Sequence, residues 1–434
     1  MTPRDWLRKF GAALERGDID AAAGLFQPEC FWRDLVAFTW NIKTCEGRAE
    51  IKAMLAATLA ATRPSNFVAK SDEWFTFETK LGRGIGHLRL RNKHAWTLLT
   101  TLQELKGFEE RRDEIRLEQR PSPAQAPFVL IVGGGQGGIA LAARLKRLGV
   151  PAAVVEKNAR AGDSWRKRYA SLCLHDPVWY DHMPYLPFPD YWPVFTPKDR
   201  MGDWLEMYVK VMQLDYRAST VCTKAAFQDG EWEVSLLRNG EPLTLRPKHL
   251  VLATGMSGFP HVPPVKGGES FQRSGGFAVH SSKFEGGAAW KGKRAVVVGS
   301  GTSAHDICQD LYNHGAAGVT MIQRAPTIVV RSESLMDLAW GPLYSEQAVA
   351  RGISTAIADL TVASVPFKVL PDLQRPIYSE IRKRDAELYA GLEKAGFQYT
   401  FGEDGSGIHA LYLRRGAGYY IETGASKMII DGKI

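Results

Sequence analysis

Cysteine is scarce in this 434-residue sequence, and its few positions form no pattern. The chain has five cysteines, which are Cys30, Cys45, Cys173, Cys222 and Cys308. They are scattered and odd in number, and no C-x-x-C pair occurs. This spacing argues against a zinc site and against a thiol–disulfide mechanism, and it favours a reducing compartment. We therefore expect a protein without a metal centre.

Long apolar runs and charge runs of one sign are also missing. The sequence contains no apolar segment typical of a secretory signal and none long enough to span a membrane, so we expect a cytoplasmic protein. The formal net charge is +8, but lysine and arginine are dispersed and form no polybasic tract. Such a distribution favours anionic cofactors over nucleic acid as partners.

The sequence does contain a glycine-rich turn between an apolar run and a helical pattern. Residues 128–132 form a short, partly β-branched run of the kind that is buried in a parallel sheet. Gly133, Gly135 and Gly138 follow in G-x-G-x-x-G spacing. In a dinucleotide fingerprint the first glycine permits a tight turn and the second lets the backbone approach a pyrophosphate. The third lets the helix pack closely against the strand.

An acidic residue after the next predicted strand strengthens this interpretation. Residues 152–155 read as that strand, and Glu156 follows Gly138 at about the 20-residue distance that the fingerprint requires. A carboxylate there accepts hydrogen bonds from ribose hydroxyls and repels a 2′-phosphate, so the site should prefer FAD or NAD. Thr254 and Gly255 end another buried strand, where such sheets bind ligands. The alternative is a structural turn with a glutamate at the surface.

A second fingerprint follows near residue 300. Residues 294–298 form another apolar run, and a G-x-G-x-x-A pattern is then made by Gly299, Gly301 and Ala304. The next predicted strand, 319–322, is followed by glutamine and Arg324 instead of an acid. A guanidinium there pairs with a 2′-phosphate, so we expect NADPH at this site, with a surface arginine as the alternative. Two such sites imply electron transfer between a nicotinamide and a flavin.

The residues before the first fingerprint predict a separate domain. Apolar residues at helical spacing near the start and over 48–61, followed by strand-like runs over 67–105, predict helices first and a curled sheet second. This order resembles the cone-shaped SnoaL and nuclear-transport-factor superfamily, whose members hold a small molecule or dimerise. Trp32 and Asp34 could line a pocket, but core packing and surface charge are the favoured interpretation for them.

The expected fold class is α/β, with two Rossmann-type dinucleotide-binding domains preceded by a small α+β cone domain. A homodimer through the cone domain is one expected assembly. The predicted regions are a cone domain at 1–108, a charged and proline-rich linker at 109–127, an FAD-binding domain at 128–289, and an NADPH-binding domain at 290–434 with a helical insertion at about 335–395.

Further motifs resemble the flavin-containing monooxygenase family, close to Baeyer–Villiger and YUCCA-type enzymes. Gly162 and Trp165 match its G-x-x-W motif. Residues 186–189 match its proline-rich loop, and residues 253–255 match its A-T-G strand. The signature F-x-G-x-x-x-H-x-x-x-(Y/F/W) falls on Ser274, Gly276, His280 and Phe284, with serine in place of the leading phenylalanine. The resemblance covers roughly residues 128–434.

The resemblance implies a monooxygenase that uses FAD, NADPH and dioxygen. In that family NADPH reduces FAD, and a flavin C4a-(hydro)peroxide then gives one oxygen atom to a small organic substrate. By its position before the proline-rich loop, His175 falls near an asparagine that faces the flavin in relatives. His175 and Asp176 are therefore the catalytic candidates, with loop packing as the alternative. His280 is expected in the loop between the two dinucleotide-binding domains.

One departure from the family leaves other functions open. The family continues with a further strand and a second A-T-G segment, whereas here residues 431–434 read as the entry to a strand. We expect the sheet to be incomplete at the flavin, through truncation or because a partner supplies the rest. The alternatives are an NADPH-linked flavoprotein reductase or oxidase without substrate oxygenation, and a non-enzymatic protein with a degenerate dinucleotide fold.

Overall fold

The computed structural model forms two compact units and describes residues 1–111, 126–256 and 259–434. Unit 1 comprises Met1–Glu110 together with Val349–Gln374. Unit 2 comprises Arg111–Ala348 together with Arg375–Ile434. Most of the linker predicted at 109–127 lies outside the described residues, and residues 349–374, which the sequence assigns to the NADPH-binding domain, pack with unit 1.

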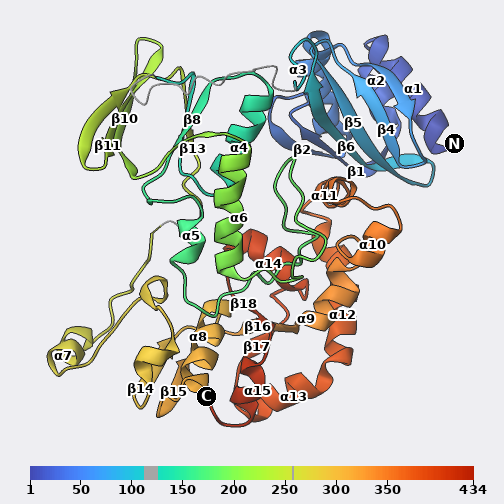
Figure 1. The fold of residues 1–434 in the computed structure, drawn as a ribbon. Helices are drawn as coiled ribbons and strands as arrows, with labels where there is room; N and C mark the ends of the chain where they lie inside the picture. The colour runs from blue at the N-terminus through green and yellow to red at the C-terminus, as the bar shows by residue number, and fades with distance from the viewer. Residues whose placement is uncertain (112–125, 257–258) are drawn as a thin grey trace. The chain divides into compact units, whose positions relative to one another are not determined.

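Unit 1 is built on a six-stranded sheet with the order β2-β1-β6-β5-β4-β3, in which only the β1–β6 pair is parallel. Helices α1, α2 and α3 pack on one face of it (Figure 1). The elements are α1 (Pro3–Glu15), α2 (Ile19–Gly24), β1 (Phe26–Leu35), β2 (Ile42–Glu46), α3 (Gly47–Thr62), β3 (Ser65–Ala69), β4 (Trp74–Glu78), β5 (Gly82–Arg91) and β6 (His94–Leu105). The helix predicted at 48–61 and the strand runs of 67–105 are confirmed, whereas β1 and β2 are absent from the prediction.

An aromatic core fills the space between α1 and the sheet. Thr2 caps α1 by accepting a hydrogen bond from Asp5 N, and Pro3 begins the helix. Trp6 stacks on Phe10 with ring centroids 4.7 Å apart. These apolar side chains recur every three to four residues, so they share the face that packs on the sheet.

Trp32 and Asp34 are both fully buried, which agrees with the favoured core packing for Trp32 and contradicts the surface charge expected for Asp34. Trp32 Nε1 donates to Thr100 Oγ1 at 2.9 Å. The Asp34 carboxylate accepts hydrogen bonds from the backbone of Phe38 and Thr39 and from the hydroxyls of Thr39 and Thr100. Core packing is therefore the correct alternative for Trp32, and Asp34 is a structural acceptor.

The other face of the sheet in unit 1 is covered by residues 349–374, which include α11 (Thr355–Ala363). Arg33 and Arg89 reach the carbonyl oxygens of Val365 and Ser364, just past the end of α11, at 3.5 Å each. Cations there complement the helix dipole. A homodimer through this domain stays a prediction.

The first half of unit 2 contains a parallel sheet with the order β13-β7-β8-β9 and an antiparallel meander β10-β11-β12. Asn239 and Gly240, both with positive φ, form the hairpin turn between β11 and β12. The elements are β7 (Val129–Val132), α4 (Gln136–Arg147), β8 (Ala152–Val155), α5 (Asp163–Arg166), α6 (Lys198–Val211), β9 (Asp215–Arg217), β10 (Thr220–Gln228), β11 (Glu231–Arg238), β12 (Glu241–Leu245), β13 (His249–Leu252) and α7 (Gly268–Arg273).

The second half of unit 2 has a parallel pair, β14–β15, and a parallel three-stranded sheet, β17-β16-β18. Both glycine fingerprints thus lie in strand–turn–helix–strand units, and the α/β fold class is confirmed. The elements are η1 (Ser281–Lys283), η2 (Gly287–Trp290), β14 (Arg294–Val298), α8 (Thr302–Asn313), β15 (Gly318–Ile322), β16 (Thr327–Arg331), α9 (Ser332–Leu335), η3 (Met336–Trp340), α10 (Glu346–Ala350), α12 (Leu370–Arg384), α13 (Ala386–Lys394), β17 (Tyr399–Thr400), α14 (Gly407–Arg415), β18 (Tyr419–Glu422) and α15 (Ala425–Ile430).

The strand entry predicted at 431–434 is wrong. Helix α15 precedes these residues and buries Ile429 in a cluster with Leu392 and Tyr420. Gly432 has a φ of 70° and donates its N–H to Ile429 O, which is typical of a glycine that ends a helix. Residues 431–434 therefore form the turn after a helix.

Candidate functional site

The first glycine turn, residues 133–138, packs tightly against neighbouring backbone at Gly133 and Gly138 and has free space at Gly135. Gly133 has a φ of 111° and donates its N–H to Val155 O at 2.9 Å. A Cβ at Gly133 would lie 2.3 Å from Ala253 O and would clash with it. A Cβ at Gly138 would lie 2.0 Å from Gly133 O. Gly135 is the N-cap of α4, and a Cβ there would meet nothing within 4 Å. The steric demand at Gly133 and Gly138 and the free space at Gly135 are those of a phosphate cradle.

Glu156 lies at the mouth of this turn, one residue after β8. Its carboxylate accepts hydrogen bonds from Gly134 N at 2.7 Å, from Asn158 N at 2.9 Å and from Asn158 Nδ2 at 2.7 Å. The hydroxyl of Tyr216 donates a hydrogen bond to Gly134 O at 3.1 Å and so stabilises the turn. Each carboxylate oxygen has further acceptor capacity, and the binding of ribose hydroxyls by Glu156 stays a prediction.

Of four further residues predicted to contact the cofactor, Thr254 and Gly255 lie next to the first glycine turn, whereas Gly162 and Trp165 pack against α6. Thr254 follows β13, and its N lies 3.2 Å from the position of a Cβ at Gly133. Gly255, with a φ of 78°, continues that segment. Gly162 faces α6 instead, because a Cβ there would lie 2.1 Å from Gly202 O. Trp165 packs on the apolar cluster that α6 contributes to. Contact of these last two residues with a cofactor stays a prediction.

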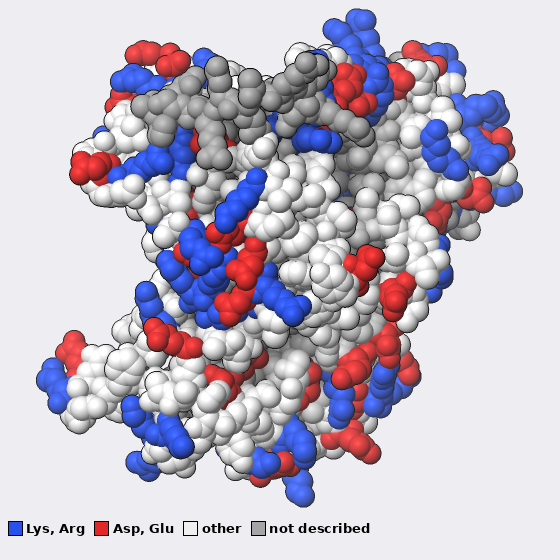
Figure 2. Space-filling view, in the orientation of Figure 1, with Lys and Arg blue, Asp and Glu red and all other residues white. Residues whose placement is uncertain are grey.

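An ion-pair network joins α5 to α6. Arg166 lies 3.1 Å from Asp163, 2.8 Å from Asp203 and 2.9 Å from Glu206. Hydrogen bonds, first from Arg160, lower the pKa of Glu206 to about 2. Figure 2 shows basic and acidic side chains interspersed over this part of unit 2. The network fixes the close approach of α5 to α6 at Gly162.

The second glycine turn repeats the geometry of the first. Gly299 has a φ of 128° and donates its N–H to Ile322 O at 2.9 Å, as Gly133 does to the end of β8. Gly301 begins α8. A Cβ at Gly299 would lie 3.9 Å from the Cβ of Ala304, which is an ordinary contact. This turn therefore accommodates alanine at its third position, whereas the first turn requires glycine there.

The residues after β15 refine the prediction for Arg324. Strand β15 ends at Ile322, so Gln323 occupies the place that Glu156 has after β8. Gln323 donates to Gln398 O at 2.8 Å and accepts from Gln398 N at 2.9 Å. Arg324 is the next residue along and is exposed. Arg324 therefore lies two residues after Ile322, the residue at the end of β15 whose carbonyl accepts the hydrogen bond from Gly299.

His175 and Asp176 lie in a cluster of titratable side chains. His175 Nε2 is 3.0 Å from the hydroxyl of Tyr419. Burial raises the pKa of Asp176, and the neighbouring His175 opposes the rise. Burial, with a smaller effect of Asp176, raises the pKa of Asp181 to about 8. Asp181 Oδ2 is buried and has no hydrogen-bond partner among the described residues.

Helix α8 adds a carboxyl to this cluster. Asp306 accepts a hydrogen bond from the hydroxyl of Tyr169 at 2.7 Å. Burial raises the pKa of Asp306, and the hydrogen bond from Tyr169 and the charge of His175 oppose the rise. Sequence analysis missed Tyr419, Asp181 and Asp306. The only local signal was that Asp306 lies in the helix that follows the second fingerprint.

His280 caps the short helix η1. Its Nδ1 accepts a hydrogen bond from Ser282 N at 3.1 Å. This contact is local to the loop, so a role of His280 between the two dinucleotide-binding domains stays a prediction.

The titration of Asp181 gives a testable pH dependence. Its pKa is raised in the folded chain, so folding favours the protonated form, and this contribution is lost as the pH rises from about 4 towards 8. We expect the gain in free energy of unfolding from Asp181→Asn to be larger at pH 9 than at pH 5 by more than about 1 kcal/mol. Urea unfolding at both pH values measures this difference.

The matched control for that experiment is Asp190→Asn, because Asp190 is an exposed aspartate on the same loop. It should change the free energy of unfolding equally little at pH 5 and pH 9. An Asp181→Asn protein whose stability relative to the parent chain is the same at the two pH values would contradict the assigned burial of a titrating carboxyl.

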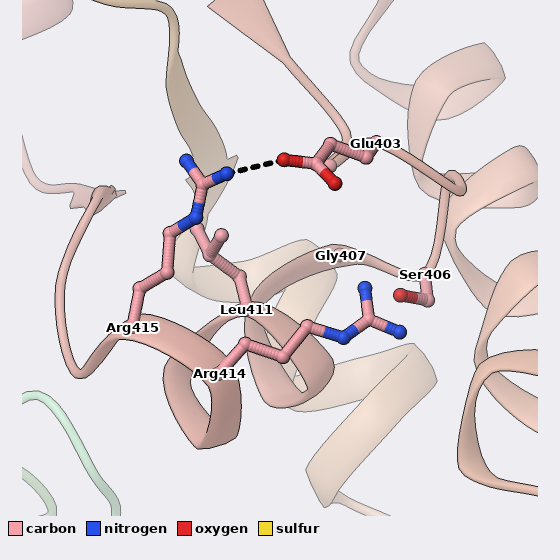
Figure 3. Close-up of a pocket in the computed structure, with 7 residues that line it drawn as sticks. Glu403, Ser406, Gly407, Leu411, Arg414 and Arg415 are labelled. Atoms are coloured by element: carbon pink, nitrogen blue, oxygen red, sulfur yellow. Dashed lines mark hydrogen bonds and ion pairs between the residues drawn. The ribbon is translucent and has the colours of Figure 1, made fainter. Parts of the chain in front are cut away.

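A separate hollow of about 240 Å³ lies around the N-terminal turn of α14 (Figure 3). Arg414 is paired with Asp404 at 2.7 Å, and Arg415 is paired with Glu403. The hydrogen bonds from Arg414 and Ser406 hold the pKa of Asp404 well below its usual range. Both arginines are already neutralised, so this hollow offers no uncompensated positive charge for an anion.

Two further searches concern metal and membrane. Within the described residues, no group of three or more His, Cys, Asp and Glu side chains is arranged to hold a metal ion. In the same part of the chain, no helix is long and apolar enough to cross a membrane.

Comparison with known proteins places the dinucleotide-binding region. Residues 130–339 match the family model described as pyridine nucleotide-disulphide oxidoreductase. Indole-3-pyruvate monooxygenase YUCCA1 of Oryza sativa subsp. japonica is 37% identical over 209 residues, which are 48% of this chain and 48% of that protein. The dinucleotide-binding region is similar to flavin-containing monooxygenases.

Other relatives cover a similar share. Indole-3-pyruvate monooxygenase YUCCA4 of the same rice is 30% identical over 263 residues, which are 57% of this chain and 58% of that protein. A solved flavin-containing monooxygenase from Stenotrophomonas maltophilia is 21% identical, with a TM-score of 0.43, and the match covers 53% of this chain and 68% of that one. The chain spans about half the length of the curated relatives it matches.

Proposed function

We propose that this protein is an FAD- and NADPH-dependent monooxygenase that transfers one atom of dioxygen to a small organic substrate. The observation that carries this proposal is the pair of glycine turns of one geometry, followed by Glu156 at the first and by Arg324 at the second. The similarity of residues 130–339 to oxidoreductases supports it. Domain boundaries at 128–289 for FAD and 290–434 for NADPH belong to this proposal.

The first turn fits the pyrophosphate of FAD. The open side at Gly135 and the N-terminus of α4 offer N–H groups to phosphate, while Gly133 and Gly138 keep the backbone close to the sheet. Glu156 would accept hydrogen bonds from the ribose, and Thr254 and Gly255 would line the adjoining edge. When bound, the flavin supplies the two-electron chemistry that activates dioxygen.

The second turn fits NADPH by the same argument. Gly299 and Gly301 shape the cradle before α8, and Arg324 would pair with the 2′-phosphate. We expect Arg324→Ser to lower the preference for NADPH over NADH by about 10- to 100-fold, because only NADPH carries that phosphate. Equilibrium binding of NADP⁺ and NAD⁺ measures the preference.

The control for this substitution is Arg294→Ser. Arg294 is exposed at the opposite, amino end of β14, away from the carboxyl edge where the turn lies. It should leave the preference unchanged. A loss of affinity in Arg324→Ser that is equal for NADP⁺ and NAD⁺ would contradict the assignment of Arg324 to the 2′-phosphate.

The residues of this chain that would serve the reaction lie in the His175 cluster. His175 can hold or release a proton at Nε2, where the hydroxyl of Tyr419 orients the ring.

The experiment that tests the proposal is a coupled assay under dioxygen. Because the curated relatives are named indole-3-pyruvate monooxygenases, a 2-oxo acid is the first substrate class to test, followed by ketones, amines and sulfides. We expect NADPH consumption to rise with one of these classes and to match an oxygenated product. NADPH oxidation that yields only hydrogen peroxide would favour the alternative, a flavoprotein oxidase without oxygenation.

A further inference from the structure

Tyr419 connects two parts of unit 2 that are 244 residues apart in the sequence. Its hydroxyl lies 3.0 Å from His175 Nε2, and the two rings meet at 90°. Its backbone carbonyl accepts a hydrogen bond from Thr302 Oγ1 at 3.0 Å. Thr302 is the first residue of α8 and directly follows Gly301 in the second glycine turn. Tyr419 therefore contacts both the catalytic candidate and the nucleotide cradle.

We propose that Tyr419 is a positioning residue, which holds His175 through Nε2 and links the protonation of His175 to nucleotide binding at the second turn. The link rests on the proposed function, whereas the contact with His175 stands without it. A tyrosine hydroxyl donates to a neutral imidazole and accepts from an imidazolium. The contact therefore persists in both states, and His175 takes up or releases its proton without losing its orientation.

Several charged groups act on His175. Asp176, the next residue in the chain, and Asp306 of α8 interact electrostatically with His175, and Asp181 interacts with Asp176. Tyr412 packs against Tyr419 on the side of α14. The N-terminus of α8 carries partial positive charge, which an anionic pyrophosphate would offset. Nucleotide binding should therefore raise the proton affinity of His175.

The first test uses the full chain without nucleotide, labelled with ¹³C and ¹⁵N at histidine and observed by NMR. His175→Gln assigns the His175 signals. We expect His175 to be mainly the Nδ1–H tautomer, and Tyr419→Phe to mix the tautomers and move the titration midpoint by about half a pH unit or more. The hydrogen bond from Thr302 goes to the backbone of Tyr419, so this substitution leaves it in place.

The matched control is Tyr412→Phe, which removes a hydroxyl from the neighbouring ring and should change neither the tautomer nor the midpoint. If Tyr419→Phe also leaves both unchanged, Tyr419 does not position His175 and the inference is overturned. A purely structural role would change the stability of β18 without changing the tautomer of His175, which also overturns it.

The second test adds NADP⁺ to the same samples. We expect the midpoint of His175 to rise in the parent chain, and to rise by less than half as much in Tyr419→Phe. An equal rise in both proteins would overturn the link through Tyr419. If no NADP⁺ binds, the proposed function and the link both fail, and the titration without nucleotide still decides whether Tyr419 positions His175.

Discussion

Gly138→Ala should abolish binding of the flavin nucleotide. A Cβ at this position would lie 2.0 Å from Gly133 O, which belongs to the backbone and has no free rotation to avoid it. The helix α4 would have to move away from β7, and the N–H groups of the turn would no longer converge on one phosphate. We expect the affinity for FAD to fall by about 100-fold or more, as measured by the fluorescence of added FAD.

The neighbouring glycine gives a closely matched control. Gly137 is in the same helical turn, and a Cβ there would meet nothing within 4 Å. Gly137→Ala should therefore retain full affinity for FAD and slightly favour the helix. If the two substitutions have the same effect on FAD affinity, the close approach at Gly138 is not what shapes the site.

Asp34→Ala should destabilise the sheet of unit 1 by about 3–5 kcal/mol. The buried carboxylate accepts hydrogen bonds from Phe38, Thr39 and Thr100, and alanine would leave their donors without this partner in the interior. Hydrogen exchange followed by mass spectrometry reports this locally. Peptides from β1 should exchange about 100-fold faster or more.

Asp72→Ala is the control for this prediction, because Asp72 is exposed in the turn between β3 and β4. It should leave the protection of β1 unchanged. Unchanged protection of β1 in Asp34→Ala as well would contradict the structural role of the carboxylate and would reopen a role for Asp34 in binding.

Local chemistry explains what the sequence could predict. The glycine turns were predictable because the steric demand at Gly133 and Gly138 arises within a few residues of each strand. The prediction also placed Glu156 correctly at the first turn. At the second turn, the hydrogen bond between Gly299 and Ile322 sets a register that places Gln323, and not Arg324, directly after the strand. The predicted strand 319–322 already has glutamine before Arg324, so this order follows from the sequence.

The remainder depends on contacts between distant residues. Strand β1 was missed because it is buried on both faces over much of its length and shows no simple alternation. The pairing of His175 with Tyr419 joins segments that no local pattern connects. Residues 349–374 read as part of a helical insertion, whereas their contacts, including those with Arg33, Arg89 and Glu46, assign them to unit 1.

The central claim is that unit 2 binds a flavin and a nicotinamide that exchange electrons. Anaerobic titration of the FAD-loaded protein with NADPH, followed by the absorbance of the flavin, tests it most directly. The account predicts that FAD binds in a one-to-one ratio and is bleached by one equivalent of NADPH, far faster than by NADH. A protein that takes up no FAD, or whose bound FAD stays oxidised in the presence of NADPH, would contradict it.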